Sequence, residues 1–91
     1  MPPEDAAKHV GESATVKGKV SSVSVSKKGD SFLNFGGIYP NQVFTAYIPP
    51  TSRVLVGQYD QKVVAVSGKI QLHKGKPEII VSSPSQIKIL P

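Results

Sequence analysis

The stretch FLNFGGIYPNQVFTAYI, residues 32–48, sets the architecture expected of this chain. Two short apolar runs, residues 32–35 and 43–48, flank a segment rich in glycine, proline and asparagine. Such runs separated by turn-forming residues are typical of a β-hairpin. The stretch also holds all three phenylalanines and two of the three tyrosines of the chain. We therefore expect one hairpin to carry most of the aromatic surface.

The two faces of this hairpin carry different sets of side chains. Successive side chains of a strand point to opposite faces of the sheet. The face expected in the core carries Leu33, Phe35, Phe44, Ala46 and Ile48. The other face carries Phe32, Asn34, Val43, Thr45 and Tyr47. One apolar face is enough to hold a hairpin on a core, so the additional aromatic rings of the second face indicate a binding surface.

Two longer runs of alternating apolar residues, 13–25 and 62–72, predict the long strands of the sheet. In the first run the alternation changes parity near Ser21, which predicts a β-bulge, and Val23 and Val25 carry the apolar pattern on. A shorter strand is expected at 77–81, and residues 86–90 either continue it or run beside the first strand. A helical turn is expected at 4–9 and a short helix or turn at 51–61.

Length, cysteine content and net charge limit the kinds of protein that this sequence can encode. Ninety-one residues suffice for one small domain with a single core. The absence of cysteine excludes a disulfide or a thiolate metal site. The formal charge of +5 favours a polyanionic partner, with solubility alone as the alternative explanation.

Targeting signals are also absent from the sequence pattern. No run reaches the ~18 apolar residues that a membrane-spanning helix needs. The opening residues do not form a signal peptide. The sequence leaves the localisation open: cytoplasmic if the chain is complete, with export possible if it is a trimmed domain.

Several motifs together resemble one known family. They are VKGKV at residues 16–20, FLNFGGIYPNQVF at 32–44, VSGKI at 66–70, GKPEII at 75–80 and SPSQI at 83–87. This set resembles the bacterial oligonucleotide/oligosaccharide-binding (OB-fold) domains related to the tRNA-anticodon-binding group, including copies attached to some nucleases and to small exported proteins. The resemblance covers roughly residues 4–90.

The resemblance implies a fold and a function. It implies an all-β, five-stranded Greek-key barrel with a short helix between the third and fourth strands. It also implies that single-stranded nucleic acid binds on the face of the second and third strands, between two flanking loops. A nuclease, attached or separate, is then a possible partner.

Catalysis is not expected. His9 and His73 stand alone, one on the helical turn and one in a basic turn, without a carboxylate next to either in the sequence. Two histidines without cysteine make a poor set of metal ligands. No nucleophile–base constellation is recognisable. We therefore expect neither an enzyme nor a cofactor or metal.

The candidate binding residues combine rings, hydrogen-bonding groups and cations. Bases stack on aromatic side chains while lysines follow the phosphates of a single strand. The candidates for stacking are Phe32, Tyr39 and Tyr47; those for hydrogen bonding are Asn34 and Thr45. The candidate cations are Lys17, Lys19 and Lys69 on the long strands, Lys27 and Lys28 in one loop, and His73, Lys74 and Lys76 in the other.

Each of these residues has a structural alternative. Phe32 could cover the edge of the barrel, and Asn34 could satisfy backbone groups. Glu78 is interpreted as an acceptor that fixes a loop rather than as a site residue.

Three functional hypotheses remain at this stage. The first is non-catalytic binding of single-stranded DNA or RNA with little sequence preference. The second is a protein–protein or assembly module that uses the same face or the edge strands. The third is binding of a sugar or small ligand in an exported protein.

Overall fold

The computed structural model describes the whole chain except residues 38–40 and 53–55, and within that part it is mostly β. The elements are a 3-10 helix η1 (Pro3–His9), strands β1 (Ser13–Val25), β2 (Ser31–Phe35) and β3 (Phe44–Ile48), 3-10 turns η2 (Pro50–Ser52) and η3 (Val56–Tyr59), strands β4 (Val63–His73) and β5 (Lys76–Ile80), 3-10 turn η4 (Pro84–Gln86) and strand β6 (Ile87–Ile89).

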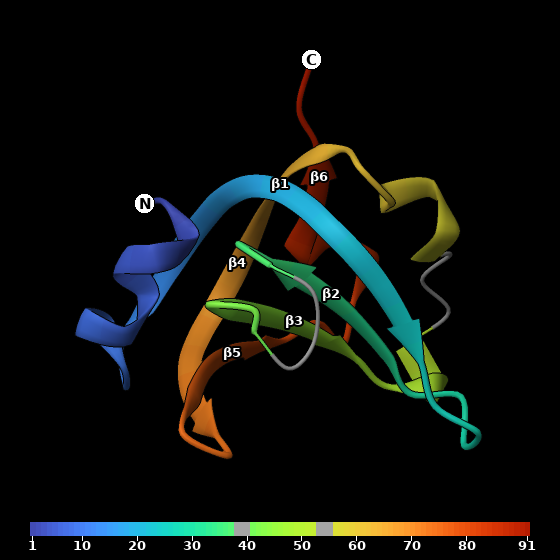
Figure 1. Ribbon diagram of the computed structural model, residues 1–91, viewed down its shortest axis with the longest axis horizontal. Helices are drawn as coiled ribbons and strands as arrows, with labels where there is room; N and C mark the ends of the chain where they lie inside the picture. Colours follow the sequence, from blue (N-terminus) through green and yellow to red (C-terminus); the bar gives the residue numbers. More distant parts are fainter. Residues whose placement is uncertain (38–40, 53–55) are drawn as a thin grey trace.

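The strands form one sheet whose hydrogen bonding closes into a ring. β1 pairs with β2, β2 with β3, β3 with β5, β5 with β4, and β4 returns to β1. All of these pairs are antiparallel except β3–β5, which is parallel. Figure 1 shows β1 arching across the molecule over the shorter strands. This small all-β ring is compatible with an OB-like fold.

One strand assignment from the sequence was wrong. Residues 86–90 neither continue the fifth strand nor run beside the first, because β6 is a separate strand that pairs antiparallel with β4. η4 precedes it, and its capping box turns the chain: the Ser83 side chain accepts from the Ser85 amide while the Gln86 side chain accepts from the Ser83 amide. The turn places Ile87 opposite Val66.

The bulge in β1 lets this strand pair in two directions. The register shifts between Val20 and Ser22, as the change of parity predicts. Residues before the shift pair with β4, and residues after it pair with β2. The continued apolar pattern is wrong at Val25, however, which is 61% exposed because β1 has left the core by this point.

The two glycines at matching positions of the long strands allow close packing. A Cβ atom on Gly18 would lie 2.5 Å from Cγ of Pro3, so glycine lets η1 rest on β1. A Cβ atom on Gly68 would lie 2.7 Å from Cγ2 of Ile79, where β4 crosses β5. A side chain at either position would separate packed elements.

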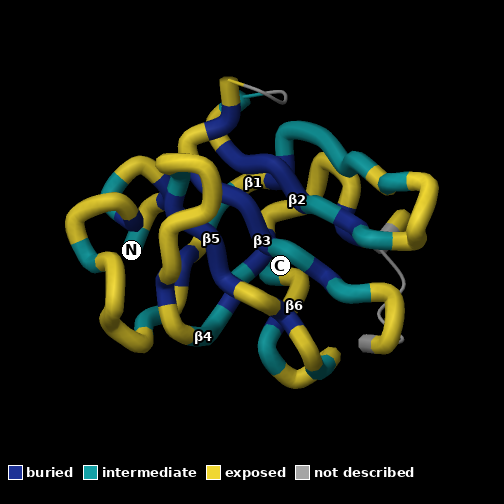
Figure 2. Tube along the Cα trace, turned by 90° about the horizontal axis from the view of Figure 1, so that it is seen from below, coloured by how far each residue is buried: buried dark blue, intermediate teal, exposed yellow. Residues whose placement is uncertain are grey.

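The core is built on the hairpin face predicted from the sequence. Its five hairpin residues are at most 2% exposed: Leu33, Phe35, Phe44, Ala46 and Ile48. The rings of the two phenylalanines lie 5.3 Å apart between centroids. Each fully buried Leu, Ile or Phe side chain contributes about 1.5–3 kcal/mol to stability. Figure 2 shows the buried segments of β2, β3 and β5 running side by side through the molecule.

Candidate nucleic-acid interface

The outer face of the sheet carries two parallel rows of side chains. In the polar row, cross-strand neighbours on five strands are Ser22, Asn34, Thr45, Glu78 and Gln71. In the adjacent row, cross-strand neighbours on four strands are Ser24, Phe32, Tyr47 and Ile80. We call these the polar row and the aromatic row. They lie side by side because their members on β2, β3 and β5 are two residues apart along each strand.

The aromatic row presents a pair of rings. The centroids of Phe32 and Tyr47 lie 5.3 Å apart with the planes tilted by 34°, and both residues are half-buried. The Tyr47 hydroxyl donates a hydrogen bond of 2.7 Å to Asp30 in the loop between β1 and β2. This hydrogen bond, followed by burial, raises the pKa of Tyr47 above 10.0. The phenol therefore stays neutral at physiological pH, and its ring is held in place beside Phe32.

Three members of the polar row, Asn34, Thr45 and Glu78, are buried although the row belongs to the outer face. Asn34 is 1% exposed, and its Nδ2 donates to the hydroxyls of Ser22 and Ser24, each at 3.1 Å. Thr45 is 6% exposed, and its hydroxyl accepts a 3.2 Å bond from Nε2 of Gln42. Asn34 thus ties β2 to β1 through side chains rather than through backbone groups.

Glu78 occupies the same row on β5 and is 8% exposed. Burial raises the pKa of its carboxyl above the usual 4.5, and the nearby His73 opposes that shift. The next residue along β5, Ile79, belongs to the core cluster, so Glu78 points to the opposite, outer face. Its interpretation as a loop-fixing acceptor is therefore replaced by a place on the candidate interface.

A groove of about 390 Å³ lies over the polar row. Its floor includes Phe32, Asn34, Gln42, Thr45 and Glu78. One wall comes from the end of β1 and the loop after it, and the other from the turn between β4 and β5. A second hollow of about 460 Å³ continues past Phe32 and Tyr47 to Leu72 and Ile80. Phe32 lines both depressions, whereas Tyr47 lines the second.

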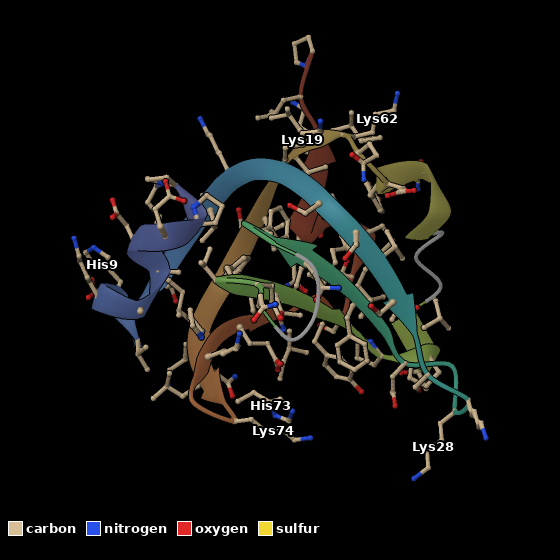
Figure 3. All side chains as sticks on the ribbon, in the orientation of Figure 1. His9, Lys19, Lys28, Lys62, His73 and Lys74 are labelled. Atoms are coloured by element: carbon tan, nitrogen blue, oxygen red, sulfur yellow. The ribbon has the colours of Figure 1, made fainter. Side chains whose placement is uncertain are left out.

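Three of the predicted cations line the groove: His73, Lys74 and Lys76. Figure 3 shows His73 and Lys74 together at the β4–β5 turn. The Lys76 ammonium donates a 2.8 Å hydrogen bond to the backbone carbonyl of Gln42, which links this wall to the residues just before β3. Lys27 and Lys28 are exposed in the opposite loop, and Figure 3 shows Lys28 projecting from its tip.

The strand lysines lie elsewhere. Lys17 and Lys19 are on the part of β1 that pairs with β4, opposite Ala65 and Val63, and neither lines the groove. Lys69 faces Ser13 across the same pair of strands. Figure 3 places Lys19 near Lys62, at the end of the molecule away from His73 and Lys74. The sequence pattern predicts Lys17, Lys19 and Lys69 as candidate binding residues, but the structure places them away from the groove.

One predicted site residue is not described by the structure, and two groove residues were not predicted from the sequence. Tyr39 lies outside the described residues. Gln42 precedes β3 in a turn-rich segment, where alternation gives no signal. The outward direction of Glu78 could have been predicted from its position between Pro77 and Ile79 in a strand.

The described residues show neither a metal-binding cluster nor a membrane-spanning helix. Within the described part of the chain, no group of three or more His, Cys, Asp or Glu residues is placed to hold a metal ion. His9 instead contacts Glu12 at 3.1 Å on the surface. Among the described residues, no helix has the length and apolar character needed to cross a bilayer.

Comparisons with known proteins identify the fold but no family. No family model and no curated protein matches this chain. A Leishmania major protein assigned as an aspartyl-tRNA synthetase superposes with a TM-score of 0.64 and 13% identity, over 98% of this chain and 20% of the synthetase. This chain therefore spans one fifth of that protein.

A second solved structure, OBody AM1L10 bound to hen egg-white lysozyme, superposes with a TM-score of 0.61 and 20% identity, over 92% of this chain and 84% of the OBody. At such low identities the two likenesses establish the fold alone. Together with the ring of strands they are compatible with a small all-β, OB-like fold.

Proposed function

We propose that this domain binds single-stranded nucleic acid without catalysing a reaction, by stacking bases on Phe32 and Tyr47 while lysines of the two flanking loops contact phosphates. The observation that carries the proposal is the pair of rings on the outer face, at the edge of a groove with basic residues on one wall. An OB-like region in a tRNA synthetase is consistent with a nucleic-acid ligand.

The chemistry of the surface fits a single strand better than a duplex. Unstacked bases expose ring faces, and each base stacked on an aromatic side chain is worth about 1–3 kcal/mol. In a duplex those faces are covered by neighbouring bases. Four lysines lie in or next to the two flanking loops and outnumber the acids Asp30 and Glu78: Lys27, Lys28, Lys74 and Lys76. Asp30 already accepts hydrogen bonds from Tyr47 and Ser26. The phosphates would therefore lie along the rims, with the bases directed at the rows.

The test is a salt series with fluorescently labelled single-stranded and duplex oligonucleotides. If Lys27, Lys28, Lys74 and Lys76 each neutralise one phosphate, log Kd against log salt should have a slope of magnitude about 3 for a single strand. Replacing Lys74 by alanine should reduce that slope, whereas Lys19→Ala removes the same charge at a position away from the groove and should leave it nearly unchanged. Binding that does not depend on salt, or equal binding of duplex, would refute the proposal.

Protein binding is the second candidate, and a separate observation favours it. Leu72 is 58% exposed and Ile80 is 37% exposed, and both line the hollow beside Tyr47. The OBody structure is of a protein bound to lysozyme, so the fold is compatible with a protein ligand. Size-exclusion chromatography across concentration separates the two candidates: a stable dimer that is lost on Leu72→Ser substitution would favour assembly.

A further inference from the structure

Two buried oxygen atoms beneath the groove lack a hydrogen-bond partner among the described residues: Oδ1 of Asn34 and Oε1 of Gln42. Both amide nitrogens are engaged, since Asn34 donates to two serine hydroxyls and Gln42 donates to Thr45. Buried polar groups are nearly always paired in folded proteins. Among the described residues these two acceptors lack donors, so a ligand that brings donors to the floor of the groove would satisfy them.

A third acceptor lies in the same place. The Glu78 carboxyl is the cross-strand neighbour of Thr45, which is in turn the neighbour of Asn34. Neighbouring strands in a sheet lie about 4.7–4.9 Å apart. Thr45 lies between Asn34 and Glu78 in the row, and Gln42 contacts Thr45, so the acceptors are grouped around Thr45.

The spacing between the aromatic row and the polar row would let one base contact both. Phe32 and Asn34 are two residues apart on β2, which is about 7 Å along a strand. A base stacked on Phe32 would therefore extend its edge over the polar row. A phosphate would not suit this position, because its oxygens would meet the Glu78 carboxyl and two further oxygens.

We propose that the floor of the groove is a base-selective subsite that takes the amino edge of a nucleobase and favours cytosine over uracil. The inference rests on the proposed function and adds a preference at one nucleotide to it. The 4-amino group of cytosine supplies two N–H donors, and carboxylates and amide oxygens accept from it. Uracil has a carbonyl at the same position, which would face the acceptors and leave them unpaired.

The size of the preference follows from this pairing. A site built to hydrogen-bond a ligand group rejects the analogue without it, because its own buried polar groups then stay unsatisfied. One well-formed base contact of this kind discriminates roughly 5- to 150-fold. Stacking does not distinguish the two bases strongly, because both are pyrimidines of nearly the same size and shape.

The test compares fluorescently labelled oligo(dC) and oligo(dU) of about twelve nucleotides, a length within the usual range of an OB-fold site. The assay is run at mildly alkaline pH, where cytosine is neutral and unpaired. Wild-type protein should bind oligo(dC) at least about five-fold more tightly than oligo(dU). Gln42→Met removes one acceptor at similar volume and should bring this ratio towards one. Gln58→Met makes the same change on the exposed surface of η3 and should preserve the ratio.

A second variant keeps the test valid if Gln42→Met does not fold. Glu78→Gln replaces one carboxylate oxygen by a donor, so it should also lower the ratio, mainly by improving the binding of oligo(dU). Equal binding of both oligonucleotides by the wild-type protein, or a ratio unaffected by both variants, overturns the subsite and leaves the proposed function standing. If neither oligonucleotide binds, the proposed function itself fails.

Discussion

The contribution of Tyr47 can be divided between its ring and its hydroxyl by two substitutions. Tyr47→Ala removes the ring that lies 5.3 Å from Phe32, and with it a stacking surface for one base. The expected loss is about 1–3 kcal/mol of binding free energy, which is roughly 5- to 150-fold in Kd. Tyr47→Phe keeps the ring and removes only the hydrogen bond to Asp30.

The second substitution therefore affects folding more than binding. The 2.7 Å hydrogen bond to the Asp30 carboxylate joins β3 to the β1–β2 loop. In general, an intramolecular hydrogen bond to a charged group contributes about 1.5–3 kcal/mol to stability. Because the pair is partly exposed, we expect a loss of about 1 kcal/mol in unfolding free energy.

The assay is fluorescence anisotropy with a labelled single strand at fixed salt, accompanied by urea denaturation of each variant. The predicted order of affinity is wild type, then Tyr47→Phe close behind, then Tyr47→Ala far weaker. If Tyr47→Ala is folded and binds as tightly as wild type, no base stacks on this ring and the reasoning about the aromatic row is refuted.

Three other predictions concern stability and charge. Glu78→Gln should raise the melting temperature at neutral pH and flatten its pH dependence. Because the pKa of Glu78 is raised in the folded state, the contribution of this group to stability is fully present below its ordinary pKa of 4.5 and is lost as pH rises through the folded pKa. Gly68→Ala should destabilise by more than about 1 kcal/mol, because its Cβ would meet Ile79 and its φ is +155°, whereas Gly57→Ala, with open space around it, should not; thermal denaturation of the pair decides this. Lys28→Ala should weaken single-strand binding at low salt more than at high salt, and an equal loss at both would contradict a phosphate contact.

The core of the fold could be predicted from the sequence because alternation specifies it directly. Leu33 and Phe35 alternate on β2, and Phe44, Ala46 and Ile48 alternate on β3, so each set must share one face of its strand. The bulge was also predictable, since a change of parity in β1 has few other causes. β6 was harder to predict, because three residues are too few to show a periodic pattern. Its pairing with β4 depends on the direction in which the capping box of η4 turns the chain.

The site could be predicted only in part, because a strand pattern gives directions but not distances. Phe32 and Tyr47 were expected on the outer face and lie there in contact. The lysines of β1 are also outward, yet the bulge turns the two halves of that strand towards different parts of the surface, so Lys17 and Lys19 lie away from the groove. Alternation along a single strand cannot show such a turn.

The acceptors of the groove depend on contacts between strands. The Asn34 amide could be assigned a free oxygen only once Ser22 and Ser24 were known to take both of its N–H groups. A sequence shows neither the register of β1 against β2 nor the burial that makes an unpaired oxygen costly.

The central claim is that the aromatic row and the groove beside it hold a single strand. The most direct measurement is a two-dimensional NMR titration with an unlabelled single-stranded oligonucleotide, which follows the backbone amides and the aromatic ring signals. The account predicts that the largest shifts fall on Phe32, Tyr47, Thr45 and the β4–β5 turn. Shifts concentrated instead on Lys17, Ala65 and Lys88, across β1, β4 and β6, would contradict it.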